Sequence, residues 1–333
     1  MTLLLERSPS LAGSAGSDSG TLYPDLELSV ISQPQIIGDP RVLVIGDIHG
    51  HYARLERLLW QEGIIGPCPM CSGLGQRPSP FRDSLLAECT QCDGDGIGRI
   101  DFKTRVVLVG DIGHFGATGS PTGDLLTWKA AVAWADVILW GNHDRAVFEN
   151  HHHFENYLPP RPETKNIIED AMRSGKLRLA VSYHGFLITH AGLHLAFRNQ
   201  KVDSYIKEDP AAFADWINDV TYPGSIGTPD QMAVRDAIPR KRGGNAPAGG
   251  ILWRDIDEKL YDKFRQIFGH SADHKEQKVR YCYQKEFTRT PALLGDSPSY
   301  CIDVGGPSEA NGAEDNCLAG IYLPDEQTVK VNL

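Results

Sequence analysis

The chain has 333 residues, of which 41% are hydrophobic and 23% are charged, and its formal net charge is −10. This length is sufficient to bury one large core or two smaller ones. The negative charge argues against general attraction to nucleic acid or to an anionic membrane, although a local basic pocket can still hold an anion. No apolar stretch approaches the roughly 18 residues that a membrane span needs, so we expect no membrane-spanning segment.

The N-terminus and the cysteines favour a cytoplasmic localisation. The opening MTLLLERSPS holds a single three-leucine run, which Glu6 and Arg7 interrupt, and this is a poor signal peptide. Seven cysteines, an odd number, include two C-x-x-C pairs. This pattern favours metal binding in a reducing compartment over a disulfide framework.

Three regions are distinguished by composition. Residues 1–37 are rich in Ser, Gly and Pro and are expected to form a disordered N-terminal tail. A single folded domain is expected over residues 38–333, with an insert at 66–100 that contains the C-x-x-C pairs. Residues 223–250 are expected to form a long surface loop because they are rich in Gly and Pro. The Arg240-Lys241-Arg242 run in that loop is interpreted as a charged loop that could steer an anionic substrate.

From Arg41 onward, apolar strands alternate with helical patterns. VLVI at 42–45 predicts a buried strand, and Leu55, Leu58 and Leu59 follow it at helical spacing. RVVLVG at 105–110 predicts a second strand, with a helix at about 122–135. Further strands are expected at 137–140 (VILW), 186–189 (FLIT) and 266–268 (QIF), and CIDV, LAGIYL and TVKVNL supply three closing strands. This alternation predicts an α/β core.

Side chains able to bind a metal follow five of these strands. They are Asp47, His49 and His51, then Asp111 and His114, then Asn142, His143 and Asp144, then His190, and finally His270. Taken alone, each is as well explained by a turn, a helix cap or a buried histidine in the core. Because open α/β sheets gather ligands at the carboxyl ends of their strands, five in succession predict one shared site.

In this order the segments GDIHG, GDIG, GNHD, THAG and FGH resemble the signature of the calcineurin-like metallophosphoesterases. THAGL, LWR at 252–254 and CIDVGG near the C-terminus resemble the PPP-type serine/threonine phosphatases, especially those of bacteria and phages. The resemblance covers roughly residues 40–330, apart from the cysteine insert and the long loop. It implies a four-layer α/β/β/α sandwich, in which two sheets pack face to face with helices outside and the three closing strands belong to the second sheet.

The resemblance also implies a two-metal centre that hydrolyses phosphomonoesters. Asp47 and His49 would hold the first metal, Asp111 would bridge both, and the second metal would be held by Asn142, His190 and His270. Two cations about 3.5–4 Å apart would lower the pKa of a shared water and clamp a phosphoryl group for attack by the bridging hydroxide. These donors are compatible with Mn, Fe and Zn.

His143, Asp144 and Arg254 are the expected catalytic residues. In the family, the histidine equivalent to His143 acts as general acid toward the leaving alkoxide, and the alternative for His143 is a turn histidine bonded to the backbone. Arg254 of LWR can pair two phosphoryl oxygens, and its alternative is a structural ion pair with a nearby aspartate. Arg145, directly after GNHD, is a second candidate for the phosphate contact.

The second motif departs from the PPP pattern GDxVDRG. His114 and Phe115 stand where the pattern has Asp and Arg, and Trp140 rather than Arg precedes GNHD. Two customary positive contacts to phosphate are therefore absent, while the metal ligands are complete. We expect His114 either to replace the missing Asp as partner of His143 or to touch substrate.

These departures leave the substrate open. A phosphorylated protein or small molecule is the expected substrate, and a dinucleoside-polyphosphate hydrolase or phosphodiesterase is the alternative within the superfamily. A third alternative is not an enzyme: a zinc-knuckle adaptor whose phosphatase fold is vestigial.

The insert carries its own metal-binding pattern. Cys68 and Cys71 are separated from Cys89 and Cys92 by 17 residues, which fits the spacing of a structural zinc site. The glycines after each pair resemble the CxxCxGxG knuckles of J-domain co-chaperones. A redox-active dithiol pair is the alternative. The insert either overhangs the active site or recruits a protein partner.

Overall fold

The structure is a computed structural model, and it describes residues 40–79, 82–114, 120–149, 159–199, 209–221, 225–271, 280–282, 299–303 and 317–332. The expected tail at 1–37 lies outside these residues, as does Phe115. Gly38–Leu333 form one compact unit. The statements below concern the described residues of that unit.

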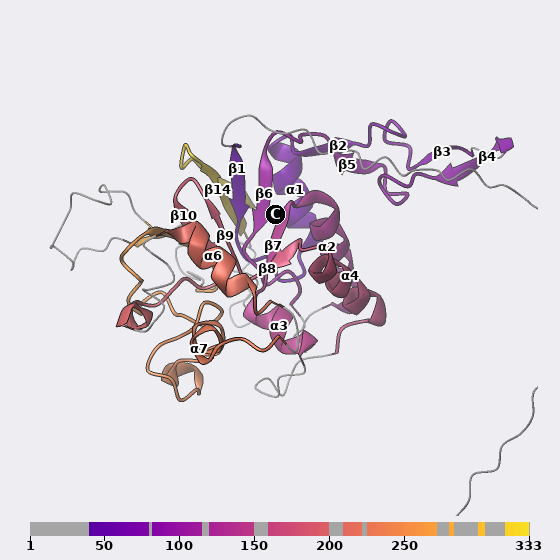
Figure 1. Cartoon of the computed structure of the whole chain (residues 1–333). Coiled ribbons are helices and arrows are strands. Elements are labelled where there is room, and N and C mark those ends of the chain that lie inside the picture. The colour runs from indigo at the N-terminus through magenta and orange to yellow at the C-terminus, as the bar shows by residue number, and fades with distance from the viewer. Residues whose placement is uncertain are drawn as a thin grey trace, which may run out of the picture. The chain divides into compact units, whose positions relative to one another are not determined.

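A six-stranded mixed sheet supplies the first half of the fold (Figure 1). Its strand order is β15-β14-β1-β6-β7-β8, and β1, β6, β7 and β8 run parallel. The bounds are β1 Val42–Ile45, β6 Arg105–Leu108, β7 Val137–Leu139, β8 Leu177–Arg178, β14 Cys317–Leu323 and β15 Thr328–Asn332. The four residues of β1 are all buried, as expected for a parallel strand covered on both faces.

A five-stranded sheet supplies the second half, in the order β12-β13-β11-β10-β9. Within it β10, β11 and β13 run parallel. The bounds are β9 Ala180–Tyr183, β10 Phe186–Thr189, β11 Arg265–Phe268, β12 Arg280–Cys282 and β13 Ser299–Cys301. Val44 and Val107 of the first sheet pack in one buried cluster with Ile188 and Ile267 of the second, so the two sheets lie face to face.

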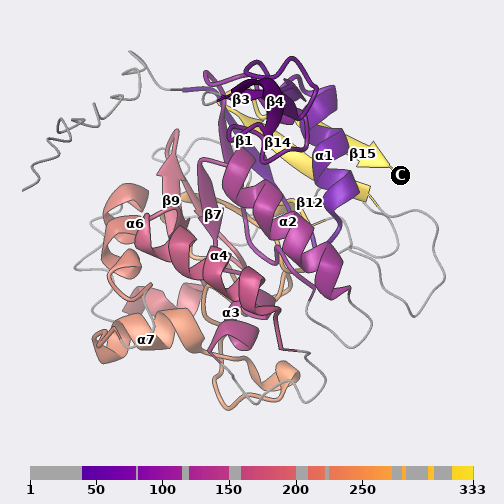
Figure 2. The same ribbon diagram turned by 90° about the vertical axis from the view of Figure 1, so that its right-hand side faces the viewer.

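Helices cover the outer faces of both sheets (Figure 2). Helices α1 and α4 contact strands of the first sheet, and α2 contacts both helices and shares a buried cluster with β1. Helix α6 lies against β9 and β10 of the second sheet, with α7 packed on α6. The bounds are α1 Tyr52–Gln61, α2 Pro121–Trp134, α3 Asn142–Phe148, α4 Pro162–Arg173, α6 Pro210–Asn218 and α7 Pro229–Asp236, with 3-10 turns at Leu195–Asn199 and Arg240–Arg242. The expected four-layer sandwich is therefore confirmed.

Two expectations about the elements were wrong. The segment 223–250 is not a continuous loop, because Thr228 caps the start of α7: its hydroxyl accepts from Gln231 N, and the Gln231 side chain accepts from Thr228 N. The closing strands also do not all join the second sheet. Strand β14 pairs antiparallel with β1 of the first sheet, and β15 pairs with β14, which leaves only β13 in the second sheet.

The insert is built from two short strand pairs. Strand β2 (Ile65–Pro67) pairs with β5 (Ile97–Arg99), and β3 (Gln76–Ser79) pairs with β4 (Arg82–Glu88). Strand β2 contacts α1, and β5 contacts α2, so the base of the insert is fixed to the first helical layer. Arg99 strengthens this base through an ion pair of 2.8 Å with Asp136.

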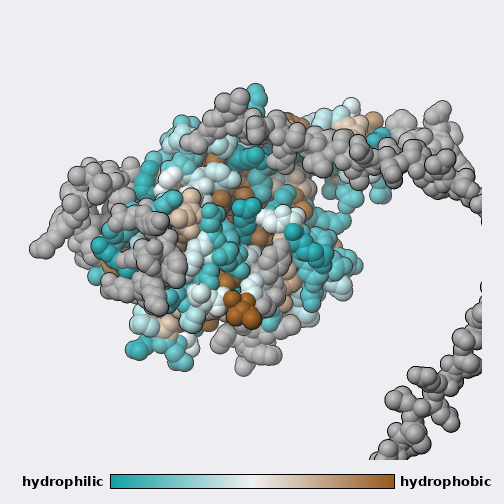
Figure 3. Space-filling view, viewed as in Figure 1, coloured by the Kyte–Doolittle hydropathy of each residue, from teal (hydrophilic) through white to brown (hydrophobic). Residues whose placement is uncertain are grey.

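Among the described residues, no helix combines the length and apolar character of a membrane span. The face shown in Figure 3 is mostly hydrophilic, with small and separated hydrophobic areas. This face therefore has the character expected of a water-exposed surface.

Candidate metal centre

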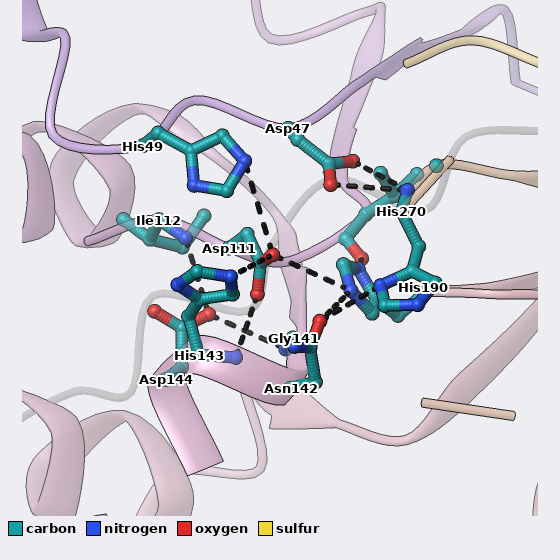
Figure 4. A network of polar contacts seen from close by, with 12 residues as sticks. Asp47, His49, Asp111, Ile112, Gly141, Asn142, His143, Asp144, His190 and His270 are labelled. Carbon is teal, nitrogen blue, oxygen red and sulfur yellow. Dashed lines mark hydrogen bonds and ion pairs between the residues drawn. The ribbon is translucent and has the colours of Figure 1, made fainter. Parts of the chain in front are cut away.

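The loops that follow five parallel strands meet at one place. Asp47, Asp111 and Asn142 follow β1, β6 and β7 of the first sheet, whereas His190 and His270 follow β10 and β11 of the second. Figure 4 shows their side chains pointing toward one another. The structure thus brings the expected ligands from both sheets into a single cluster at the carboxyl ends of the strands.

The geometry of the second ligand set fits a bound cation. Asn142 Oδ1 lies 2.8 Å from His190 Nε2 and 2.8 Å from His270 Nδ1, and Asp111 Oδ2 lies 3.6 Å from His190 Nε2. The other nitrogen of His190, Nδ1, donates to Val109 O at 3.0 Å. His190 Nε2 therefore carries a lone pair that faces two further electron-pair donors, and a cation among them relieves this repulsion.

The first ligand set comprises Asp47, His49 and Asp111, whose ligand atoms lie within 4.8 Å of one another. His49 Nε2 is 3.9 Å from Asp111 Oδ2. Asp47 is oriented by the backbone of the opposite sheet, because its Oδ2 accepts from His270 N at 3.0 Å. Asp111 belongs to both sets, as the expected bridging role requires.

Strained backbone and close packing form the cradle of the site. His49, Asp111 and His270 have φ angles of 51°, 47° and 69°, in the left-handed region that non-glycine residues rarely adopt. A Cβ on Gly141 would lie 2.0 Å from Asp111 Oδ1, and one on Gly269 would lie 1.9 Å from Asp47 Oδ1. Glycine is thus required at both positions, so that the backbone can approach the carboxylates.

Burial dominates the electrostatics of the site. It raises the pKa of Asp47 well above its usual value, and the neighbouring Asp303 and Asp111 raise it further. Burial also raises the pKa of Asp111, and it lowers the pKa of His190 to about 3. Crowded carboxylates and neutral imidazoles are unfavourable by themselves and favourable around a divalent cation.

His143 lies beside these ligands with a defined orientation. Its Nδ1 lies 3.2 Å from the carbonyl oxygen of His114, and its Nε2 lies 3.8 Å from Asp111 Oδ2. Burial lowers the pKa of His143 to about 4. The expected partnership of His114 with His143 is therefore made by the backbone carbonyl of His114, which substitutes for an aspartate side chain at this position.

A match to a family model identifies the family of the chain. Residues 40–286 match the model of the calcineurin-like phosphoesterases, which is more than half of the chain. The chain belongs to the calcineurin-like phosphoesterases. It is therefore a phosphoester hydrolase, and the enzymes of this family typically depend on two metal ions. None of the curated proteins compared with the chain matches it.

The solved structures with a similar fold share little sequence identity with this chain. A protein assigned provisionally as a diadenosine tetraphosphatase shares 14% identity at a TM-score of 0.40, over 88% of this chain and 94% of its own. A serine/threonine phosphatase from Saccharomyces cerevisiae, with similarity to human PP5, shares 13% at 0.41, over 89% and 80%. A predicted phosphoesterase from Streptococcus pneumoniae TIGR4 shares 11% at 0.27, over 90% and 100%. These likenesses are too remote to indicate a substrate.

Asp144 of this phosphoesterase is held by the backbone around it. It is fully buried, and its carboxylate accepts from Ile112 N at 3.1 Å, Gly113 N at 3.1 Å and Gly141 N at 3.3 Å. These contacts tie the loop after β6 to the start of α3 (Figure 4). Asp144 is a positioning residue that holds Asp111 and Asn142 in register.

Both arginines expected to contact phosphate are buried and bonded to neighbouring segments. Arg254 is fully buried, and its guanidinium donates to the carbonyl oxygens of Ala191, Asp255 and Glu258. Arg145 is buried too, with ion pairs of 2.6 Å to Asp236 and 2.8 Å to Glu149. These guanidinium contacts fasten neighbouring segments together.

Two charged residues of the site were missed by the sequence reasoning. Asp303, two residues after β13, is buried and raises the pKa of both Asp47 and Asp111. Arg242 donates from Nε to Asp255 Oδ1 at 2.8 Å, and its charge lowers the pKa of His190 and His270. The CIDV segment, an apolar strand followed by an aspartate, could have indicated Asp303. Nothing in the RKR run distinguishes Arg242 from its two basic neighbours.

The four cysteines of the insert form a second cluster. Their sulfur atoms lie within 4.8 Å of one another, with Cys68 to Cys89 at 3.8 Å and Cys71 to Cys92 at 3.7 Å. Around a tetrahedral zinc with Zn–S bonds of about 2.3 Å, sulfur atoms are separated by about 3.8 Å. The tetrathiolate geometry therefore fits a structural zinc.

The two knuckles of this cluster are internally alike. Gly75 N donates to Cys71 Sγ at 3.2 Å, and Gly96 N donates to Cys92 Sγ at 3.3 Å. The backbones of the two knuckles are in close contact. A Cβ added to Gly75 of the first knuckle would lie 2.0 Å from Gly94 O of the second, so this position has no room for a side chain. N–H donors directed at sulfur stabilise thiolates, which supports metal binding.

Proposed function

We propose that this protein is a metal-dependent phosphomonoesterase that acts on phosphorylated proteins or small molecules. The observation that carries the proposal is the convergence of His190 Nε2, His270 Nδ1 and Asp111 Oδ2 around Asn142 Oδ1. Neutral imidazole nitrogens and a carboxylate gathered in this way are stabilised by a cation among them. The donors suit Mn, Fe or Zn, and the reducing compartment implied by the cysteines supports a cytoplasmic setting.

When bound, two divalent cations would supply an activated water nucleophile and neutralise charge on the phosphoryl group. In this proposal, Asp47 and His49 hold one cation, Asp111 bridges, and Asn142, His190 and His270 hold the other. His143 Nδ1 remains bonded to the His114 carbonyl, so Nε2 is the atom that would face the leaving oxygen. Burial favours the neutral imidazole, so Nε2 would deliver a proton only from the imidazolium form, which the negative charge of a bound phosphate favours. Asp144 keeps the two loops in place through its three backbone contacts.

Arg242 is the residue we assign to the phosphate. Its side chain is 32% exposed, and Asp255 holds it from one side. Among the carboxylates whose charge raises its pKa, Asp111 acts most strongly. A guanidinium held in the field of the metal ligands can pair with phosphoryl oxygens once the cations are present.

A dinucleoside-polyphosphate hydrolase or phosphodiesterase is the second candidate. It is favoured by the burial of Arg254 and Arg145, which leaves Arg242 as the one assigned guanidinium for a phosphate group. A less highly charged diester needs fewer such contacts than a phosphomonoester dianion. The adaptor alternative is disfavoured because the ligand set of the metal centre is complete.

The decisive experiment is turnover of a substrate panel by the manganese-loaded protein and by Asp111→Asn. We expect hydrolysis of p-nitrophenyl phosphate and of phosphoserine or phosphothreonine peptides, and a loss of at least ~100-fold in the variant, because a bridging oxygen loses its charge. Turnover of diadenosine polyphosphate without turnover of phosphopeptides would select the second candidate. If no substrate is turned over with Mn, Fe or Zn, the adaptor alternative is supported.

A further inference from the structure

Three imidazoles form a third group of ligand atoms beside the metal centre. His49, His114 and His143 each offer a ring nitrogen, and these atoms lie within 4.8 Å of one another. The ring centroids are 5.1 Å apart for His49 and His143, 5.7 Å for His49 and His114, and 6.1 Å for His114 and His143. Around a tetrahedral zinc with Zn–N bonds of about 2.0–2.1 Å, ring centroids lie roughly 5 Å apart.

Contacts around the cluster restrict these histidines. His143 uses Nδ1 for the His114 carbonyl, which leaves Nε2 as its ligand atom. His49 Nδ1 is buried and has no hydrogen-bond partner among the described residues. His114 is fixed by its backbone, because its N–H donates to the buried carboxylate of Asp124 at 2.7 Å.

We infer that His49, His114 and His143 form an alternative zinc site whose occupation inhibits the enzyme. Three neutral nitrogen donors favour zinc, whereas the carboxylate-rich set of Asp47 and Asp111 suits manganese. The two positions exclude one another, because a neutral His49 ligates only one ion at a time. Zinc at the alternative site removes His49 from the first cation and His143 from proton transfer.

The inference goes beyond the proposed function and gives His114 a role that the family motif does not provide. A histidine in place of an aspartate adds the third nitrogen donor that this site needs. The consequence is a centre that responds to the ratio of the two metals: manganese supports turnover, and zinc in excess stops it.

The test is a zinc titration of the manganese-loaded protein, with the cysteine insert already filled with zinc. The variants are His114→Ala and His114→Phe, and the second keeps a ring but lacks a ligand atom. His184→Ala is the matched control, because His184 is bonded to Pro40 O rather than placed in the cluster. Each protein is compared with its own manganese activity before zinc is added.

We expect zinc to reduce wild-type and His184→Ala activity at least tenfold and to release one Mn per chain, detected by electron paramagnetic resonance. In both His114 variants the inhibiting zinc concentration should rise at least tenfold. Zinc-edge X-ray absorption of the wild type should show the added ion with imidazole nitrogens. Equal inhibition of the His114 variants, or added zinc bound by carboxylates, would overturn the inference. The measurements of Mn release and of zinc-edge absorption test the alternative zinc site even if the protein turns over no substrate.

Discussion

At the scale of single residues, the orientation of His143 decides what its loss does. Its Nε2 faces Asp111 Oδ2, and a proton from this atom matters only when the leaving oxygen is a strong base. We predict that His143→Ala lowers kcat for an alkyl phosphate by about 100-fold, and for p-nitrophenyl phosphate by less than about 10-fold. Steady-state kinetics with both substrates measure the difference, and equal losses would show that His143 acts in another way.

Arg242 gives a second prediction at this scale. A charge-assisted hydrogen bond to phosphate is worth about 1.5–3 kcal/mol, so Arg242→Ala should raise KM for a phosphomonoester at least about tenfold. Arg240→Ala is the matched control, since Arg240 is an exposed residue of the same 3-10 turn. An unchanged KM in the Arg242 variant, or the same rise in the control, would contradict the assignment.

The limits of sequence reasoning are also clearest at individual residues. The order of the motifs predicted which side chains gather at the strand ends, because an apolar strand followed by a polar side chain is a local pattern. Arg254 and Arg145 carried the right chemistry, but only the tertiary structure reveals that their guanidinium groups bind carbonyls and carboxylates elsewhere. Arg242 was not predicted as a site residue because its position depends on Asp255, 13 residues away in the chain.

At the scale of elements, local chemistry explains both the successes and the errors. The buried strands and helix α2 were predicted from apolar periodicity, and Ser120 caps α2 by accepting from Gly123 N. Helix α7 was missed because the glycine and proline content of the segment predicted a loop, although Thr228 and Gln231 form a capping box there. The sheet membership of β14 was missed because its pairing with β1 joins residues about 280 positions apart, such as Val42 and Leu323, which no local pattern records.

The cysteine insert gives the prediction at this scale. Its buried core is the group of four cysteines, so a bound zinc supplies much of its folding energy. Cys89→Ser should lower zinc content by about one ion per chain and open residues 66–100 to limited proteolysis, while the manganese content stays unchanged. Cys301→Ser, which alters a buried thiol in β13, should leave zinc content unaltered. Full zinc retention in Cys89→Ser would contradict the tetrathiolate assignment.

At the scale of the whole molecule, the metal centre joins the two sheets and sets the pH dependence of stability. Burial raises the pKa of Asp47 and Asp111 in the metal-free fold. Their neutral forms favour folding below about pH 4, where unfolded carboxyls are also protonated, and this contribution is lost as pH rises through the raised pKa values. When both carboxylates are ionised, their repulsion at about 5 Å destabilises the metal-free fold by about 3 kcal/mol at an effective dielectric constant near 20.

We therefore predict that the Tm of the metal-free wild type falls relative to that of Asp111→Asn as pH rises above about 4, because the variant lacks one of the repelling charges. The buried neutral histidines contribute equally to both proteins, so the difference in Tm isolates the carboxylates. Manganese should restore the wild-type Tm at neutral pH. Differential scanning calorimetry of both proteins measures the difference, and a difference that stays constant over this range would refute the assignment of a strained carboxylate pair.

The most direct test of the whole account is a count of the manganese bound at the centre. Equilibrium dialysis followed by elemental analysis and electron paramagnetic resonance should find two spin-coupled Mn ions per chain in the wild type, in addition to the zinc of the insert. Asp111→Asn should lose the coupling and at least one ion. A wild-type protein that binds no manganese, or an Asp111→Asn variant that keeps a coupled pair, would contradict the paired-cation centre.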